Sequence, residues 1–353
     1  MKNLRILITG AGAPGILGTL YSLKNNFDNR SVYIIGTDSN LEVVGKYVCD
    51  KFFQIPHSSL RDEYLDSMEK ICSNEEVDII IPQNTFELSL LSERKKIFER
   101  KGTRILVSDP QAIEMSNNKY RLMQKCNEIG IPVGEFKIVN NFKDLKIFAK
   151  KLGWPKREVV IKPPISNGLR GVRIIDENFD SKKAFYSEKP TSLTTKMDNL
   201  YGVIGDSFPE LIVTEFLSGI EYTVDVFRYN EQSIVIPRLR ELVRSGITFT
   251  GKSIKHEKII EYSLALSNSI GLEYCFGFQF KLDGKDCPKI LESNPRIQGT
   301  MVLSTFSGAN IIYLSVKALL GENFNLPQVN WNTRLLRYWG GIAVHDEKQI
   351  GRL

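Results

Sequence analysis

The sequence of 353 residues is poor in the residues that build disulfide frameworks and zinc sites. It holds five cysteines and three histidines, and no two cysteines have the C-x-x-C spacing. Because the cysteines are odd in number and widely scattered, the sequence argues against a disulfide framework and against a zinc knuckle. With so few histidines, a histidine-based metal site is not expected either.

Long apolar runs are also missing. No run approaches the roughly 20 apolar residues that a membrane-spanning helix needs. The apolar segment at the N-terminus is short, contains Arg5 and merges into a glycine-rich turn, so it is expected to be a strand and not a signal peptide. The sequence therefore predicts a cytoplasmic protein without membrane contact.

Charge of one sign does not dominate either. The 47 basic residues exceed the 41 acidic residues by six, and the densest basic runs, Glu93–Lys101 and Arg238–Ser245, are short and mixed with acids. Solvated helix faces are the simplest interpretation of such runs. If they bind anything, the pattern favours small anionic ligands over a nucleic-acid track.

Short β-branched strands alternate with helical segments over the first 108 residues. The expected strands are Arg5–Thr9, Val32–Thr37, Phe52–Ile55, Asp78–Pro82 and Arg104–Ser108. Helical periodicity fills Leu60–Ser73 and Phe86–Lys101. This alternation predicts a parallel α/β sheet four or five strands wide.

The segment "SDPQAIEMSNNKYRLMQKCNEIGIP" then predicts one amphipathic helix that stops at Gly130 and Pro132. The polar residues Asp180–Gly205 are expected to form a mobile flap. Antiparallel strands follow, with turns at Ser218–Gly219 and Asn230–Glu231.

Three further elements are expected towards the C-terminus. Residues Lys255–Gly271 should form a helix, and a hairpin should turn at Asp283–Gly284. The segment "NIIYLSVKALLG" predicts a closing helix.

Two short motifs look like nucleotide sites. Gly10-x-Gly12-x-x-Gly15 follows the first strand, and Asp38 ends the second, which is the pattern of a dinucleotide fingerprint. An NAD(P)-dependent oxidoreductase is therefore one alternative, with Asp38 on the ribose. The structural alternative is that the glycines allow a tight turn and close packing of helix on strand.

The second motif, "GITFTGKS" (Gly246–Ser253), matches the phosphate-loop pattern. Its intervening residues are bulky or stiff, and the charged residues before it do not form the buried strand that such a loop follows. A solvated turn is the preferred interpretation.

A wider set of residues carries a stronger signal. Lys162 ends an apolar strand and a flexible Ser166–Gly171 loop follows it, while Glu215 ends a later strand. Glu292 and Asn294 are two residues apart, so they should project from one face of a strand. Oxygen ligands in that arrangement suit magnesium that bridges phosphate oxygens. The rest of the set comprises Lys119, Phe216, Leu217, Glu221, Gln279 and Arg296.

At these residues the chain resembles the ATP-grasp superfamily, and most closely the single-module relatives of the carbamoyl-phosphate synthase large chain. The string "NPRIQ", which contains Arg296, is also similar to the biotin carboxylase signature. The resemblance implies a Rossmann-like parallel α/β domain over residues 1–112, which frames the substrate site and does not bind NAD. An ATP-grasp fold of two α+β subdomains that clamp ATP would follow over residues 113–325. A flexible lid at about 132–213 and a C-terminal tail at 326–353 complete the expected organisation.

The resemblance also implies a role for each matching residue. Lys119 and Lys162 would contact the nucleotide phosphates, and the loop with Ser166, Gly168 and Gly171 would close over them. The backbone at Glu215, Phe216 and Leu217 would meet the adenine, and Glu221 the ribose hydroxyls. Gln279, Glu292 and Asn294 would hold Mg²⁺, with Mn²⁺ as an alternative. Arg296 would stabilise the transferring phosphoryl group or the acyl substrate. Two residues depart from common family members: Asn118 stands where many have Asp, and Gln279 replaces an acidic ligand.

The implied activity is an ATP-dependent carboxylate–amine or carboxylate–ammonia ligase that forms an acyl phosphate and releases ADP and phosphate. Its partners would be a small carboxylate and an amine or ammonia, and a homodimer is one expected assembly. Arg238, Arg240 and Arg244 are candidates to bind an anionic substrate. Carbamoyl-phosphate-synthase-type activation of bicarbonate or carbamate and a non-catalytic nucleotide sensor stay open as alternatives.

Overall fold

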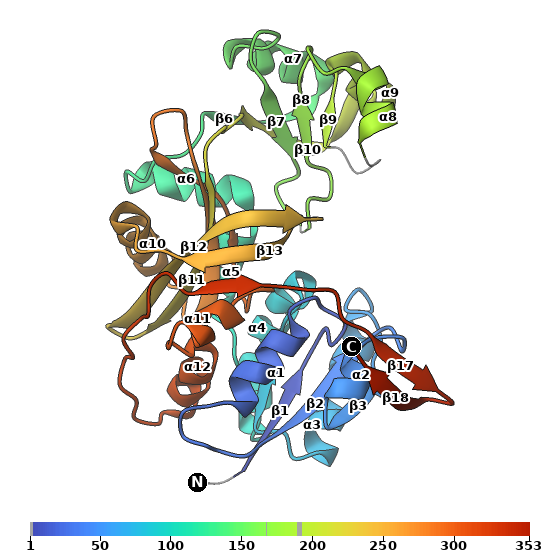
Figure 1. Ribbon diagram of the computed structural model, residues 1–353, viewed down its shortest axis with the longest axis vertical. Coiled ribbons are helices and arrows are strands. Elements are labelled where there is room, and N and C mark those ends of the chain that lie inside the picture. The colour runs from blue at the N-terminus through green and yellow to red at the C-terminus, as the bar shows by residue number, and fades with distance from the viewer. Residues whose placement is uncertain (1–2, 167, 189–192) are drawn as a thin grey trace.

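The computed structural model describes residues 3–166, 168–188 and 193–353, which form three units along the long axis of Figure 1. The first unit is built on a five-stranded parallel sheet of order β3-β2-β1-β4-β5. Its strands are β1 (Leu4–Ile8), β2 (Val32–Asp38), β3 (Lys51–Gln54), β4 (Ile79–Ile81) and β5 (Arg104–Ile105). The predicted parallel sheet is confirmed.

Helices cover both faces of this sheet, because alternate residues of its strands point to opposite sides. On β1, Leu4, Ile6 and Ile8 pack towards α1, while Leu7 packs towards α3 and α4. The helices of this unit are α1 (Ile16–Lys24), α2 (Gly45–Val48), α3 (Arg61–Asn74) and α4 (Thr85–Arg100). The two helices predicted here are confirmed within one residue at each end.

The predicted single helix after this unit is wrong. Two helices form, α5 (Pro110–Asn117) and α6 (Lys119–Glu128), and the chain breaks between them at Asn118. Asn118 has extended backbone angles, and its side chain accepts the backbone N–H groups of Tyr120 at 3.0 Å and Arg121 at 3.2 Å. An asparagine that caps a new helix N-terminus thus interrupts a pattern that is helical on both sides.

The second unit, at the top of Figure 1, corresponds to the segment expected to form a lid, and we keep that name for it. Its sheet has the order β6-β10-β7-β8-β9 and carries its own apolar core, which includes Val139, Phe148, Ile161 and Val213. The strands are β6 (Phe136–Asn141), β7 (Val159–Lys162), β8 (Arg173–Ile175), β9 (Thr194–Thr195) and β10 (Ser207–Glu215), and the helices α7 (Phe142–Lys151), α8 (Ser181–Ser187) and α9 (Met197–Ile204).

The prediction of a mobile flap at Asp180–Gly205 is corrected, because this segment is part of the lid. Residues 189–192 of that segment lie outside the described residues, and the described remainder contains α8, β9 and α9. Met197 and Leu200 of α9 are buried in the lid core, which explains why this polar segment folds.

The third unit is an antiparallel sheet of order β15-β14-β11-β12-β13-β16. Its strands are β11 (Glu221–Tyr229), β12 (Gln232–Arg244), β13 (Ile247–Ser253), β14 (Tyr274–Leu282), β15 (Pro288–Asn294) and β16 (Arg334–Leu336). One face packs on α5, α6 and α10 (Glu257–Ile270), and the other on α12 (Ile311–Leu320), after the short α11 (Val302–Phe306). The predicted late hairpin and both late helices are confirmed.

Of the predicted turns in this region, one is confirmed, and the turns at Ser218–Gly219 and at the phosphate-loop lookalike are corrected. The turn at Asn230–Glu231 joins β11 to β12 as expected, but Ser218–Gly219 joins β10 to β11, which lie in different sheets. The phosphate-loop lookalike is not a solvated turn. It forms β13, antiparallel to β12, with Phe249 buried.

The C-terminal segment returns to the first unit. After β16, Arg337 donates a hydrogen bond of 2.8 Å to the carbonyl of Pro14, and a hairpin of β17 (Ile342–His345) and β18 (Lys348–Arg352) projects beside α2 (Figure 1). The same apolar core contains β1 and α1 of the first unit together with α12 and Phe227 of the third. The first and third units are thus joined by one core, whereas the lid has its own.

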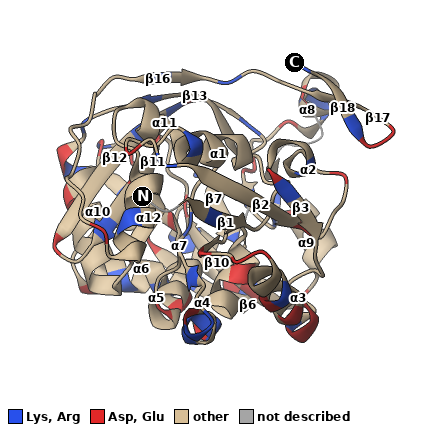
Figure 2. Cartoon of the chain, turned by 90° about the horizontal axis from the view of Figure 1, so that it is seen from below, with Lys and Arg blue, Asp and Glu red and all other residues tan. Residues whose placement is uncertain are grey.

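The surface carries mixed charge. Figure 2 shows basic and acidic residues interspersed over this view of the molecule. Over the described residues, no helix has both the length and the apolar character required to cross a membrane.

Candidate active site

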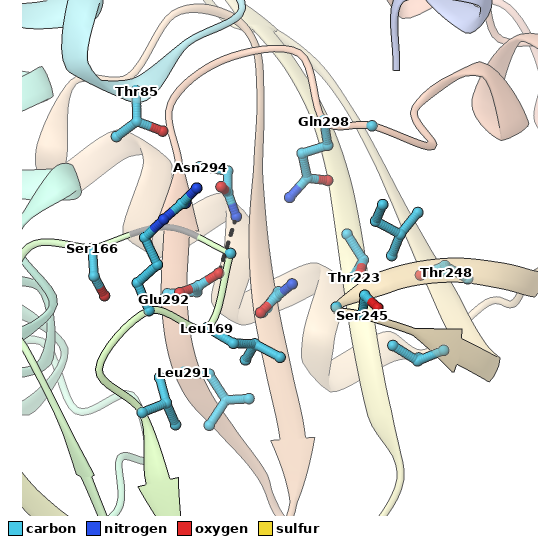
Figure 3. Close-up of a pocket in the computed structure, with 18 of the residues that line it drawn as sticks. Thr85, Ser166, Leu169, Thr223, Ser245, Thr248, Leu291, Glu292, Asn294 and Gln298 are labelled. Carbon is cyan, nitrogen blue, oxygen red and sulfur yellow. Dashed lines mark hydrogen bonds between the residues drawn. The ribbon is translucent and has the colours of Figure 1, made fainter. Parts of the chain in front are cut away.

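A cavity of about 890 Å³ lies where the three units meet. Its walls come from the glycine turn and the β4–α4 turn of the first unit, from β7, β8 and their loop in the lid, and from β14, β15 and the segment after β15. A volume of this size suits a nucleotide-sized ligand. Figure 3 shows Thr85 of the first unit, Ser166 of the lid and Glu292 of the central sheet around this cavity.

Two buried lysines face one carboxylate in the cavity. Lys119 is the first residue of α6, and its Nζ lies 2.8 Å from the carbonyl of Ser166 and 3.4 Å from Glu292 Oε2. Lys162 ends β7 and donates a hydrogen bond of 3.0 Å to the carbonyl of Leu291. The break at Asn118 matters for the site, because it makes Lys119 the first residue of α6, and Lys119 lines the cavity.

Burial affects the charge of Lys162. Desolvation lowers its pKa to about 8, Glu292 acts in the opposite direction, and Lys119 adds to the lowering. Two ammonium groups beside a single carboxylate leave an excess of positive charge in a site shielded from water. Such a site favours an anion with several oxygens, because a triphosphate can accept hydrogen bonds from both lysines.

The three predicted metal ligands lie together. The Asn294 amide donates to Glu292 Oε1 at 3.4 Å, as the dashed line in Figure 3 shows. Gln279 lies opposite Glu292 in the β14–β15 ladder. With its amide turned to satisfy both neighbours, its nitrogen lies 3.1 Å from Glu292 Oε1 and its oxygen 3.2 Å from Arg240. Strand pairing thus collects one carboxylate and two amides.

Arg296 connects this group to the first unit. Its Nε donates to Thr85 Oγ1 at 3.2 Å, and its Nη2 lies 3.4 Å from Asn294 Oδ1. Burial lowers the pKa of the guanidinium, and the negative charge of Glu292 opposes this shift. An arginine stays charged under such a shift, so Arg296 provides a fixed cation in the cavity.

The loop after β7 lines the cavity and contains two glycines with positive φ. Ser166, Gly168, Leu169 and Arg170 line the cavity, while Asn167 lies outside the described residues. Gly168 and Gly171 have φ values of 60° and 74°, which glycine adopts without strain. A Cβ at Gly171 would lie 2.6 Å from Pro163 Cγ, so this position has no room for a side chain.

The segment between β10 and β11 forms another wall. Glu215, Phe216 and Leu217 line the cavity beside the apolar side chains of Val160 and Ile174. The Glu215 side chain binds Lys289 at 2.7 Å, and its backbone N–H is bonded to Glu135 at 3.3 Å. The side chain and the backbone N–H of Glu215 are thus both engaged within the protein.

Glu221 and Arg240 form an ion pair within the cavity wall. Arg240 also donates to Thr248 Oγ1 at 3.1 Å and to the carbonyl of Gly246 at 2.7 Å. Arg240 therefore lines the cavity but is held by protein groups on three sides.

The other two arginines predicted to bind substrate are corrected. Arg238 is 1% exposed, and its guanidinium pairs with Asp225 at 2.7 Å beneath the cavity surface. Arg244 is exposed and lies over the ring of Phe249, 4.8 Å from its centroid. The residues that line the cavity include neither side chain.

Several cavity residues were missing from the sequence prediction. They are Gln83, Asn84 and Thr85, which follow β4, and Gln298, Gly299 and Thr300, which follow β15. Their signals were present: the carboxyl end of a parallel strand carries ligand residues, and Gln298 continues the two-residue spacing of Glu292, Asn294 and Arg296. Within the described chain, the buried Nε2 of Gln83 has no hydrogen-bond partner.

The two competing nucleotide motifs have other roles here. The glycine turn lines the same cavity, and Asp38 accepts the backbone N–H of Gly12 at 2.8 Å, which stabilises the turn itself. Lys252 of the phosphate-loop lookalike lies in the β13–β12 ladder opposite Leu239.

Two family models match parts of the chain. Residues 207–337 match a model described as "ATP-grasp in the biosynthetic pathway with Ter operon", and residues 6–106 match the PylC-like N-terminal domain. The first range covers β10 of the lid and the antiparallel sheet of the third unit. The second range covers the parallel sheet of the first unit.

Two relatives match longer stretches of the chain. The carbamoyl phosphate synthase large chain of Rubrobacter xylanophilus is 28% identical over 228 residues, which cover 64% of this chain but only 21% of that protein. The formate-dependent phosphoribosylglycinamide formyltransferase of Prochlorococcus marinus is 23% identical over 320 residues, which cover 86% of this chain and 76% of that protein. Thus the match spans about a fifth of that synthase and three quarters of the formyltransferase.

The fold is also that of a solved enzyme. A biotin carboxylase from Campylobacter jejuni, in complex with an ATP analogue, superimposes with a TM-score of 0.67 at 19% identity, covering 93% of this chain and 74% of that one. The parallel N-terminal sheet, the lid and the antiparallel sheet are therefore one known architecture. Residues 207–337 thus match an ATP-grasp family model, and the chain resembles the carbamoyl phosphate synthase large chain.

Proposed function

We propose that this protein is an ATP-dependent ligase that joins a carboxylate to an amine or to ammonia through an acyl phosphate, with release of ADP and phosphate. One observation carries the proposal: Lys119, Lys162 and Arg296 converge on the Glu292–Asn294 pair inside one cavity. Cations that surround a single carboxylate suit the transfer of a highly charged phosphoryl group.

The residues support a division of the cavity into a nucleotide end and a substrate end. At the nucleotide end, the β10–β11 segment and the apolar wall would hold the base, and Glu221 the ribose. Lys119 and Lys162 would bind the phosphates, with the loop at Ser166 closing over them. For Lys119 to do so, its contact with Glu292 must be exchanged for one with a phosphate oxygen.

The donor set fits magnesium only in part. Mg²⁺ prefers oxygen ligands and is often held by one or two carboxylates together with substrate phosphates. Glu292 supplies the carboxylate, but the amide nitrogens of Asn294 and Gln279 face it, so both amides would have to turn to offer an oxygen to the metal. Among the described residues, no three acidic, His or Cys side chains form a metal site. We therefore infer that Mg²⁺ enters with the nucleotide, and Mn²⁺ is a permitted substitute. The bound metal would neutralise phosphate charge.

At the substrate end, Arg296 would orient the carboxylate and stabilise charge on the transferring group. The carboxylate oxygen attacks the γ-phosphorus, the bond to ADP breaks, and the nitrogen nucleophile then displaces phosphate from the acyl carbon. A closed lid would keep water from the acyl phosphate. The glycine turn and the Gln83–Thr85 turn would border the acceptor, as expected for a first unit that frames the substrate.

A second candidate is the activation of bicarbonate or carbamate, which the 28% identity to a carbamoyl phosphate synthase large chain favours. The two candidates share the phosphoryl transfer and differ in the acceptor. A homodimer and a cytoplasmic location are further expectations for this chain.

The proposal is tested by a screen for ADP release. The full chain is incubated with MgATP and a matrix of carboxylates against amines and ammonia, with bicarbonate included as its own column. We expect ADP to form only when both an acceptor and a nitrogen donor are present. Thermal unfolding with MgATP or NADH runs in parallel. Stabilisation by NADH and none by MgATP would overturn the proposal.

A further inference from the structure

A buried charged network lies directly beneath the substrate end of the cavity. Its centre is the ion pair between Arg238 of β12 and Asp225 of β11, which are 1% and 0% exposed. Ser304 donates to the other oxygen of Asp225 at 2.5 Å. Burying an ion pair is costly, and apolar residues of similar volume often stabilise a protein better. The pair therefore calls for an explanation other than stability.

The outer members of the network explain it. Arg238 donates from Nη1 to Thr300 Oγ1 at 2.5 Å and from Nη2 to Gln298 Oε1 at 3.2 Å. Gln298 and Thr300 both line the cavity, whereas Arg238 and Asp225 do not. The network thus consists of a charged pair below the surface and two neutral side chains at the surface.

These bonds determine which way Gln298 points. Its amide oxygen faces the guanidinium, because the alternative orientation would set two donors against each other. The amide nitrogen is therefore left for the cavity. Glycine at position 277 makes the space, since the Gln298 amide lies only 2.3–2.5 Å from where a Cβ of that residue would be. Figure 3 shows Gln298 next to the end of β15, across from Thr85.

The same argument applies to Thr300. Its hydroxyl oxygen accepts from Arg238, so its hydrogen is free to point elsewhere. Together the two side chains offer donors to the cavity, close in sequence to the Arg296 guanidinium. Hydrogen-bond donors suit the oxygens of a carboxylate and do not suit a group that is itself a hydrogen-bond donor.

We propose that Arg238 is a positioning residue that, from its buried pair with Asp225, holds Gln298 and Thr300 as hydrogen-bond donors to the substrate carboxylate. The proposal rests on the ligase function proposed above. It also gives Arg238 a different role from direct contact with an anionic substrate.

The first test needs no knowledge of the natural substrate. The full chain is labelled with ¹⁵N at glutamine side chains, and the Gln298 signals are identified by their loss in Gln298→Glu. Sodium formate, the smallest carboxylate, is titrated in the presence of MgADP. We expect formate to shift the Gln298 amide signals in the wild type. In Arg238→Lys, which keeps the buried charge but loses the fork of donors, we expect a response about tenfold weaker.

Arg30→Lys is the matched control. Arg30 is also buried and also pairs with a carboxylate, Glu322 at 2.7 Å, but it is not part of the cavity wall. Arg30→Lys should respond to formate as the wild type does. A Gln298 signal that ignores formate in the wild type, or one that responds equally in Arg238→Lys, would overturn the proposal.

The second test is kinetic. With a carboxylate that supports ADP release, Arg238→Lys should raise the KM for that carboxylate about tenfold and leave the KM for ATP within about twofold, as expected for the loss of a hydrogen bond at one substrate. Equal rises in both KM values would contradict a positioning role. If no carboxylate supports ADP release, the ligase proposal fails, and the formate titration still decides the role of Arg238.

Discussion

At the scale of residues, Glu292 concentrates the chemistry of the site, because Lys119, Asn294 and Gln279 all contact its carboxylate. Glu292→Gln keeps the shape but removes the negative charge at the place proposed for the metal and the phosphates. We expect turnover to fall by roughly 10²–10³ while MgATP still binds, as is typical when one preorganised electrostatic contact is lost.

Glu241→Gln is the control for this change, since Glu241 is exposed on β12 and pairs with Arg334 outside the cavity. Arg296→Lys should reduce turnover less than Glu292→Gln does, because lysine keeps the charge and loses only the planar fork of donors. The measurement is ADP release at saturating Mg²⁺. Near-normal turnover of Glu292→Gln would show that the β14–β15 hairpin is not the metal site.

A comparison of two lysines distinguishes the cavity from the phosphate-loop lookalike. Lys162→Ala should weaken MgATP binding about tenfold to a hundredfold, since hydrogen bonds to charged groups contribute about 1.5–3 kcal/mol. Lys252→Ala on β13 should leave the affinity nearly unchanged. Calorimetric titration with MgATP gives both values, and the reverse ranking would restore the phosphate loop.

Lys162 should also make nucleotide binding depend on pH. Its pKa of about 8 means that the free protein loses this positive charge as the pH rises above 8. Phosphate binding favours the charged form, so MgATP affinity should be constant below that value and fall by up to about tenfold per pH unit above it. Lys162→Arg, which keeps its charge, should remove the inflection. Identical profiles for the two proteins between pH 7 and 9.5 would contradict this assignment.

At the scale of elements, the break between α5 and α6 is the feature that places Lys119. Asn118→Ala removes the cap, and we expect the free energy of unfolding to fall by about 1 kcal/mol. We also expect weaker MgATP binding, because Lys119 loses its fixed position. Asn141 caps α7 in the lid by accepting from the backbone of Asp144 at 2.9 Å, away from the cavity wall.

Asn141→Ala is therefore the matched control: it should destabilise the protein to a similar degree and leave MgATP affinity unchanged. Urea unfolding and nucleotide titration together separate the two effects. If both variants bind MgATP like the wild type, the cap does not position Lys119.

Elements with strong periodicity could be predicted from sequence, and those decided by tertiary contacts could not. The strands of the parallel sheet and the β14–β15 hairpin follow directly from apolar runs and turn residues. The break at Asn118 could not be found, because the helical pattern continues on both sides of it and an asparagine can also lie within a single helix. The helices of the lid were missed because they are short, only seven to ten residues each.

The same distinction holds for the site. Lys162, Glu292 and Asn294 could be predicted because strand position and two-residue spacing define their direction. Arg238 and Arg240 have that spacing too, yet one lies in a buried ion pair and the other in the cavity wall. The two arginines differ in how deeply their side chains are buried. That burial is set by the packing of α11 and the residues before it, which a local pattern does not reveal.

At the scale of the whole molecule, the hydrophobic cores divide the protein into two bodies that face each other across the cavity. The parallel sheet and the antiparallel sheet share one core, so the turns proposed to frame the acceptor and the β15 region that carries Glu292 and Arg296 form one body. The lid, with its own core, contributes Lys162 and the Ser166 loop from the opposite side. The proposed phosphoryl transfer at the junction would therefore need both bodies.

The most direct test of the account follows the oxygen of the carboxylate. A carboxylate that supports ADP release is labelled with ¹⁸O, and the released phosphate is analysed by mass spectrometry. If the carboxylate attacks the γ-phosphorus and a nitrogen then displaces phosphate, one labelled oxygen must leave with the phosphate, and we predict this transfer at one per turnover. Phosphate that takes its new oxygen from water alone would contradict an acyl phosphate and, with it, the ligase function.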